Sequence, residues 1–361
     1  MENVAQGCDP RLLAVSQWFE KQQILAHSSG GTPYLRSVSI GMPTIPPPLI
    51  DSVVYLYPSE AAANSDSAPG GTGFLVGIKF EAPVPLFHIY VVTNHHVACT
   101  SGNSCVRINK RAGGADVFPF SPDSWEFIPG LDLAAISMIY NDQKYSTHFI
   151  PDVFFANDEV VGRLKLNIGE EVFMIGSFVD NHGAAINTPA ARFGNLSLMP
   201  SWLEIHDPDS GITYKGNYYC LDMRSRTGFS GSPVFYYRTS GSDLAQAGST
   251  NLSITTPKVG FLGAHAGQFP ETVKAKDSLG AKTELTAPSG MTMVIPAQKV
   301  LELLNLKKFV EFRKVTEADY FAKNPISKNS PTLESSKPTP TGDDVLKVML
   351  NTPPSPHKDG K

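Results

Sequence analysis

Short apolar runs of β-branched and aromatic residues recur between about Val53 and Ile295, with Gly, Pro, Asn or Asp between them. No helical period interrupts these runs. The pattern predicts an all-β fold of ten or more strands, and a span of this length favours a β-barrel or a pair of barrels. The runs are SVVYLY, GTGFLVGIKF, HIYVVT, DLAAISMI, EEVFMIGSF, ARFGNLSLM, GNYYCLDM, SPVFYY, VGFLGAHAG and GMTMVIP.

Helical patterns flank this β region on both sides. Asp9 and Pro10 form a typical helix start, and apolar residues then recur at helical spacing to about Ala26. The stretch GMPTIPPPLI is expected to be an irregular linker, because consecutive prolines lack N–H donors and have a fixed φ angle. After Pro296 the helical period returns in Val300, Leu301, Leu303, Leu304, Phe309, Val310 and Phe312.

These patterns divide the chain into four parts. Residues 1–50 hold the N-terminal helix and the proline-rich linker, residues 51–305 the β domain, and residues 306–323 a C-terminal helix. Residues 324–361 are rich in Lys, Ser, Pro and Thr and are expected to be a disordered tail. A short apolar motif near its end either docks on a partner or belongs to a frayed terminus.

Composition and charge narrow the function classes. Hydrophobic residues make up 41% and charged residues 18% of the 361, which is typical of a globular protein. The net charge of -4 gives no basic surface for nucleic acid or an anionic membrane. No apolar run reaches the roughly 18 residues of a membrane span, and the N-terminus does not resemble a secretory signal.

The cysteines indicate a reducing compartment. The chain contains four of them, which is few for its length, so we expect a cytoplasmic protein. Cys99 and Cys105 are close enough in sequence for a disulfide, but two free thiols are the favoured state. The His95, His96, Cys99 and Cys105 spacing matches no zinc motif, and neither a metal nor a cofactor is expected.

Three segments carry the residue types of nucleophilic acyl transfer. His96 follows the strand-like YVV, Asp132 precedes the apolar run LAAISM, and Ser230 lies on the glycine-flanked turn TGFSGSP. A serine nucleophile needs a base, a carboxylate that orients the base, and amide donors for the developing oxyanion. Gly228 lets a backbone N–H approach the substrate, so the amides of Gly228 and Ser230 are the expected oxyanion hole. A Gly-Ser-Pro stretch alone usually marks a turn, but together the three segments favour a catalytic triad.

These segments, in the order His, Asp, Ser, resemble the chymotrypsin-fold serine peptidases, in particular the bacterial Deg and glutamyl endopeptidase branch. VVTNHHV resembles its V-T-N-x-H-V motif, which selects His96 over His95, and LDLAAI resembles its D-[IL]-A motif. GTGFLV, GEEVFMIG, TGFSGSPV and GMTMVIPAQKV resemble further motifs of the branch. The resemblance covers about residues 50–305. It implies a double β-barrel of the chymotrypsin type with flanking N- and C-terminal helices, and a serine endopeptidase acting on protein or peptide substrates.

Two departures from that branch are visible. Phe229 stands where the branch has Asn or Asp, so activation by a new N-terminus that pairs with an Asp there is excluded. No PDZ domain follows the β domain within this sequence. Because a bulky residue at this position could collapse the oxyanion hole, Phe229 also motivates an alternative, a catalytically impaired scaffold that binds peptides.

The resemblance also implies a substrate pocket. Arg224 and Ser225 before the nucleophile, and His265 on the strand VGFLGAHAG, are its expected walls, with Arg226 nearby. A histidine and one or two guanidinium groups favour an acidic side chain or Gln before the scissile bond. The backbone from Ala264 to Gly267 is expected to pair with substrate as an added strand. A strand histidine without a pocket role and solvent-facing arginines are the alternative interpretations.

Overall fold

The structure is a computed structural model that describes most of residues 44–324. Within that range it leaves out residues 66, 82–83, 85, 140, 142, 207–210, 239–257 and 277–281. The predicted N-terminal helix and the predicted tail with its apolar motif lie outside the described residues. The proline-rich linker is not wholly irregular, because helix α2 (Pro47–Ile50) begins in it. Proline is tolerated there because the first N–H groups of a helix need no intrahelical partner.

The first sheet is open and has the strand order β5-β4-β1-β2-β3-β7-β6, with β8 paired to β2. All its pairings are antiparallel except the β2–β8 pair. Strand β1, which lies between β4 and β2, has the sequence VVYLY and is buried at every position. The strands are β1 (Val53–Tyr57), β2 (Gly71–Lys79), β3 (Phe87–Thr93), β4 (Cys105–Asn109), β5 (Ala115–Pro119), β6 (Glu126–Phe127), β7 (Ala134–Met138) and β8 (Ile150–Pro151).

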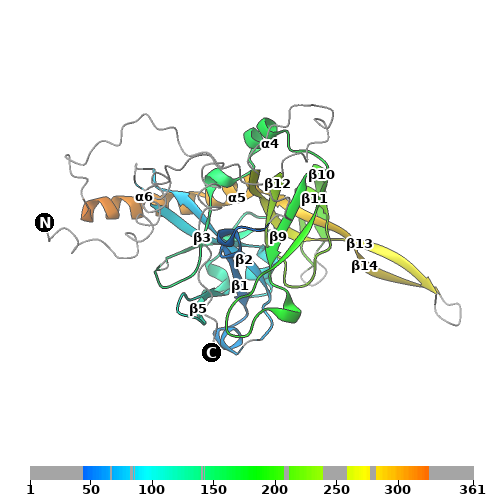
Figure 1. Cartoon of the computed structure of the whole chain (residues 1–361), viewed down its shortest axis with the longest axis horizontal. Helices are drawn as coiled ribbons and strands as arrows, with labels where there is room; N and C mark the ends of the chain where they lie inside the picture. The colour runs from blue at the N-terminus through cyan, green and yellow to red at the C-terminus, as the bar shows by residue number, and fades with distance from the viewer. Residues whose placement is uncertain are drawn as a thin grey trace, which may run out of the picture.

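The second sheet closes into a ring with the order β10-β11-β14-β13-β12-β9, and all its pairings are antiparallel. The strands are β9 (Glu171–Gly176), β10 (Ala190–His206), β11 (Thr213–Asp222), β12 (Pro233–Arg238), β13 (Lys258–Lys276) and β14 (Lys282–Pro296). Beyond the ring, β13 and β14 continue as a two-stranded ribbon that projects from the body (Figure 1). The predicted all-β class of the chymotrypsin type is confirmed, with the first of its two sheets open and the second closed.

Aromatic side chains join the two sheets into one core. The ring of Phe261 on β13 lies 5.2 Å from Phe74 on β2 and 4.6 Å from Phe155, measured between ring centroids. All three rings are buried in the same apolar cluster, which also includes Tyr55 and Phe235. The functional residues on the two sheets are therefore held by a shared hydrophobic core.

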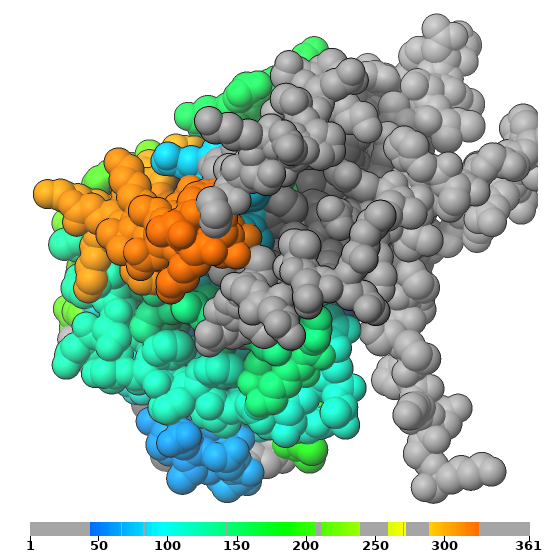
Figure 2. Space-filling view, turned by 90° about the vertical axis from the view of Figure 1, so that its left-hand side faces the viewer, coloured from blue at the N-terminus to red at the C-terminus, as the bar shows by residue number. Residues whose placement is uncertain are grey.

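The predicted C-terminal helices are present as α5 (Ala297–Leu304) and α6 (Lys307–Lys323). Helix α6 packs on the first sheet, where Phe309 meets Tyr90 edge-on at 5.0 Å and Arg313 donates a hydrogen bond to the Tyr90 hydroxyl. Figure 2 shows this helix in orange on the surface of the molecule. Two short helices, α3 (Glu60–Asn64) and α4 (Asp158–Leu164), lie in connections between strands.

Cys99, Cys105 and Cys220 are free thiols, so Cys99 and Cys105 do not form a disulfide. Among residues 44–324 as described, every helix is too short or too polar to span a bilayer.

Candidate active site

The first sheet brings His96 and Asp132 together through its strand register. Strands β3 and β7 are antiparallel neighbours, and Thr93 at the end of β3 is paired with Ala134 at the start of β7. His96 follows Thr93 by three residues and begins a short helical turn, whereas Asp132 precedes Ala134 by two. Both residues therefore emerge at the same end of the sheet.

The carboxylate of Asp132 holds His96 through two hydrogen bonds. Its Oδ2 lies 2.8 Å from His96 Nδ1, and its Oδ1 accepts the backbone N–H of His96 at 3.0 Å. Asp132 is only 3% exposed, and Asn94 fixes its backbone by donating to the Asp132 carbonyl oxygen. Because an ionised carboxylate only accepts hydrogen bonds, Nδ1 carries the proton and Nε2 keeps its lone pair as a base.

Ser230 lies on a tight loop, residues 226–231, that we name the Ser230 loop. Phe229 N–H donates to the Arg226 carbonyl, and Ser232 N–H donates to the Phe229 carbonyl. Gly228 has φ +95°, a value that glycine adopts without the steric cost of a side chain. The prediction of a bent backbone around Ser230 is thus matched by the loop geometry.

This loop packs directly against the segment that precedes His96. A Cβ atom added to Gly231 would lie 2.4 Å from Thr93 Oγ1 and 3.2 Å from the Asn94 nitrogen. The glycine therefore allows an approach that a larger residue would block. Ser230 precedes Gly231, and His96 follows Asn94 by two residues. The two sheets therefore come into contact next to Ser230 of the second sheet and close to His96 of the first.

The Ser230 loop presents two unengaged amides. Within the part of the chain that the structure describes, the N–H groups of Gly228 and Ser230 have no hydrogen-bond acceptor. Buried or half-buried amides without acceptors are uncommon in folded proteins, and free amides beside a serine hydroxyl form the arrangement that binds an oxyanion.

Phe229 does not obstruct this arrangement. Its side chain is fully buried in the core of the ring, and the guanidinium of Arg192 lies 5.7 Å from the ring centroid. The phenyl group thus makes a packing contact in the core of the second sheet.

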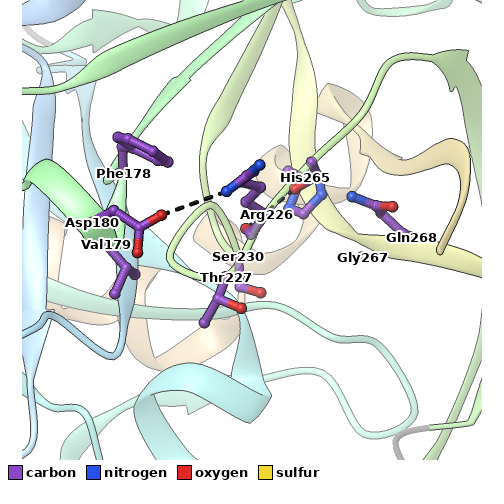
Figure 3. Close-up of a pocket in the computed structure, with 10 residues that line it drawn as sticks. Phe178, Val179, Asp180, Arg226, Thr227, Ser230, His265, Gly267 and Gln268 are labelled. Atoms are coloured by element: carbon purple, nitrogen blue, oxygen red, sulfur yellow. Dashed lines mark hydrogen bonds and ion pairs between the residues drawn. The ribbon is translucent and has the colours of Figure 1, made fainter. Parts of the chain in front are cut away.

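Ser230 opens onto a pocket of about 700 Å³ that three segments surround (Figure 3). The connection after β9 forms one side, the Ser230 loop and the residue before it form the floor, and β13 forms the other side. The lining residues are Phe178, Val179, Asp180, Ser225, Arg226, Thr227, Ser230, His265, Gly267 and Gln268.

His265 is a buried and uncharged member of this pocket. It is 2% exposed, and neither ring nitrogen has a hydrogen-bond partner among the described residues. Burial lowers the pKa of His265 to about 3, and the nearby charge of His96 acts in the same direction. Its backbone braces the Ser230 loop, because His265 N–H donates to the Ser232 carbonyl and the His265 carbonyl accepts from Gly231 N–H.

The arginine that lines the pocket is Arg226 and not Arg224, which differs from the prediction. Arg226 lines the pocket and forms an ion pair with Asp180 at 3.5 Å, in which both side chains are exposed. Arg224 does not line the pocket and is exposed, because the segment alternates it with the buried residues Met223 and Ser225.

Of the β13 residues predicted to pair with substrate, some line the pocket and others lie inside the sheet. Gly267 lines the pocket, but Ala264 is fully buried and paired on both sides, with Pro233 and Ile295. A residue inside the sheet has no free backbone edge, so the edge open to a substrate strand begins after His265 rather than at Ala264. Phe178, Val179, Asp180, Thr227 and Gln268 also line the pocket and were not among the predicted pocket residues.

Residues 71–240 match the family model described as "Trypsin-like peptidase domain". The matched residues include His96, Asp132 and Ser230 and end before β13. Over these residues the chain is similar to a trypsin-like peptidase domain.

Two solved structures illustrate the similarity. The MamO protease domain of Magnetospirillum magneticum is 16% identical, with a TM-score of 0.41 over 71% of this chain and 96% of its own. The active form of the Rv3671c protease from M. tuberculosis is 18% identical, with a TM-score of 0.35 over 76% of this chain and 93% of its own. No curated protein matches the sequence.

Proposed function

We propose that this protein is a serine endopeptidase with His96, Asp132 and Ser230 as its catalytic triad. The observation that carries the proposal is the His96–Asp132 pair beside a Ser230 loop that holds two unengaged amides. The match of residues 71–240 to a trypsin-like peptidase domain supports it. The proposed substrates are proteins or peptides, in the cytoplasm, with no metal or cofactor in the chemistry.

In the acylation step, Ser230 Oγ attacks the scissile carbonyl carbon while His96 Nε2 takes the hydroxyl proton. Asp132 stabilises the imidazolium that forms, and the N–H groups of Gly228 and Ser230 donate to the new oxyanion. The C–N bond then breaks, and the leaving amine takes the proton from His96. This leaves an ester between the substrate acyl group and Ser230.

Deacylation reverses the roles with water as the nucleophile. His96 Nε2 takes a proton from the water as its oxygen attacks the ester carbonyl carbon. The bond to Ser230 Oγ then breaks, and Ser230 recovers its proton from His96. The carboxylic acid product leaves, and the protein returns to its starting state.

Of the two side chains considered for the residue before the scissile bond, the pocket supports Gln over an acidic one. An uncharged His265 can donate one N–H to an amide oxygen but supplies no positive charge for a carboxylate. Arg226, the cation among the residues that line the pocket, forms an exposed ion pair with Asp180. A carboxylate would therefore lose its hydration without a free counter-charge.

The preference for Gln over Glu is expected to increase with pH. A Glu side chain is uncharged below its usual pKa of about 4.3 and charged above it. His265, with a pKa of about 3, stays neutral throughout that range. The ratio of kcat/KM for matched Gln and Glu peptides should therefore rise from about pH 4.5 to 7, and the His96 titration cancels in the ratio. A Glu preference at pH 7 would contradict this description of the pocket.

Replacing His265 with Leu is expected to reduce the preference for Gln over Leu before the scissile bond by about 10-fold or more. The substitution removes a buried ring whose nitrogens are bonded to no side chain among the described residues, so the loss should appear in selectivity. Paired kcat/KM measurements on peptides that differ only at this residue check it. Unchanged selectivity in a folded variant would exclude His265 from substrate recognition.

The proposal as a whole is tested by incubating the protein with a peptide library and identifying the new termini by mass spectrometry. We expect cleavage that is absent with Ser230→Ala, with Gln enriched before the scissile bond. The alternative is a peptide-binding scaffold of impaired activity. It predicts that peptides bind equally to the wild type and to Ser230→Ala and that neither protein cleaves them.

A further inference from the structure

Thr72 lies at the junction of the two sheets and has no part in the triad. It is the second residue of β2, in the first sheet, and it is fully buried. Its backbone N–H donates to the carbonyl oxygen of Ser230 at 2.9 Å, and its own carbonyl accepts from the Thr93 hydroxyl at 2.7 Å. Thr72 thus contacts the Ser230 loop as well as the strand that leads to His96.

The hydroxyl of Thr72 makes two more bonds across the junction. It donates to the carbonyl oxygen of Gly228 at 2.6 Å and accepts the backbone N–H of Ser177 at 2.9 Å. A threonine hydroxyl has one proton to donate, so both roles are filled in one arrangement. One hydroxyl therefore fixes the loop that presents the oxyanion donors and the start of the connection that forms the opposite side of the pocket.

The hydrogen bond from Thr72 holds the loop at Gly228, where the backbone has the greatest conformational freedom. Gly228 has φ +95° and no side chain, so few steric contacts of its own restrict the peptide groups on either side. The peptide between Gly228 and Phe229 is held at both ends, its carbonyl by Thr72 and its N–H by the Arg226 carbonyl. The amide of Gly228 is thereby kept at a defined place relative to the amide of Ser230.

We propose that Thr72 is a positioning residue whose hydroxyl aligns the oxyanion donors of the Ser230 loop with His96. The proposal rests on the peptidase function proposed above. Oxyanion donors act on the transition state more than on the bound substrate, so a loss of alignment lowers kcat and leaves peptide affinity largely unchanged. If Thr72 only stabilised the fold, its substitution would lower the stability of the protein without lowering kcat selectively over peptide affinity.

The test compares Thr72→Val, which keeps the shape but removes the hydroxyl, with Thr72→Ser, which keeps the hydroxyl. Thr292→Val is the matched control, because the Thr292 hydroxyl is also fully buried and donates to a backbone carbonyl, that of Met223, at 2.7 Å. Turnover is measured on one peptide. Affinity for that peptide is measured in the same variants carrying Ser230→Ala.

We expect Thr72→Val to lower kcat by about 10- to 1,000-fold, with affinity within about twofold of the parent. Outright loss of an oxyanion donor costs about 100- to 1,000-fold in kcat, and misalignment costs as much or less. Thr72→Ser should recover most of the activity, and Thr292→Val should keep it. A peptide aldehyde, which forms a tetrahedral adduct with Ser230, should bind Thr72→Val more weakly by a factor similar to the loss in kcat.

Equal kcat for Thr72→Val and Thr292→Val, or equal impairment of Thr72→Val and Thr72→Ser, would overturn the inference. Should Thr72→Val not fold, Thr72→Cys against Thr72→Ser makes the same comparison, because a thiol is a poor donor of similar size. We expect Cys to be the less active of the two, and equal activity would count against the proposal. A wild-type protein without turnover or reaction at Ser230 would instead contradict the proposed function.

Discussion

Replacing Asp132 with Asn is expected to lower kcat by about 10⁴-fold while the fold is kept. The carboxylate accepts both the backbone N–H and the Nδ1 proton of His96, and an amide has only one oxygen for these two donors. The NH₂ group of the introduced amide would face an N–H donor of His96, or it would force the ring into the tautomer with the proton on Nε2. The ring would then be unable to take the proton of Ser230.

The measurement is kcat on a cleaved peptide, with the thermal midpoint as the test of folding. Asp116→Asn is the control, because Asp116 also bonds to charged and polar partners, among them Lys110 and Lys144, but lies on β5 at the outer edge of the first sheet. It should keep its kcat. If Asp132→Asn retained more than about a tenth of wild-type kcat, Asp132 would have no orienting role.

Replacing Gly231 with Ala is expected to destabilise the protein by about 2–5 kcal/mol and to abolish activity in what remains folded. Gly231 has φ +81°, where an L-residue costs about 1–2 kcal/mol. The added Cβ would also lie 2.2 Å from the Thr72 carbonyl oxygen and 2.4 Å from Thr93 Oγ1, and overpacking of this kind costs about 1–3 kcal/mol more. Relief of the clash requires the Ser230 loop to move away from the first sheet.

Urea unfolding measures the change in the free energy of unfolding. Gly113→Ala is the matched control for the backbone contribution, since Gly113 has φ +92° but no atom within 4 Å of an added Cβ. We expect it to lose only the 1–2 kcal/mol of the backbone conformation. A Gly231→Ala protein as stable and as active as Gly113→Ala would mean that the two sheets do not meet at this loop.

The strands and the three segments that hold the proposed triad were recognisable in the sequence. Runs such as VVTNHHV combine a β-branched strand with the residues that follow it, so strand ends and reactive side chains could be predicted together. The proximity of His96 and Asp132 was then a consequence of strand register, through the pairing of Thr93 with Ala134. Local pattern and chemistry were sufficient there.

The pocket was predicted less completely, for a physical reason. One side of the pocket is formed by Phe178, Val179 and Asp180, which lie at the start of a single 3-10 turn, Val179–Asn181. A turn this short has no periodicity to indicate which side chain faces which way. Arg224 was assigned to the pocket by its position before Ser230, but alternation with buried neighbours places it in solvent. The protonation state of His265 depends on its burial by residues that are distant in sequence. The spacing of motifs along the chain does not indicate this burial.

The role proposed for Thr72 had no signal of its own. Its segment GTGFLV was recognised as a strand, and a threonine in a strand is ordinary. Its contacts with Gly228 and Ser177 join residues more than a hundred positions apart and follow from the closure of the ring against the first sheet. Features of this kind become visible only when the two sheets are seen together.

The most direct test of the account is reaction with a fluorophosphonate probe, followed by mapping of the labelled residue. We expect a single modification at Ser230 in the wild type, none in Ser230→Ala, and a rate in His96→Ala reduced by about 10³-fold or more. Label on another serine, or labelling of Ser230 at an equal rate without His96, would contradict the triad.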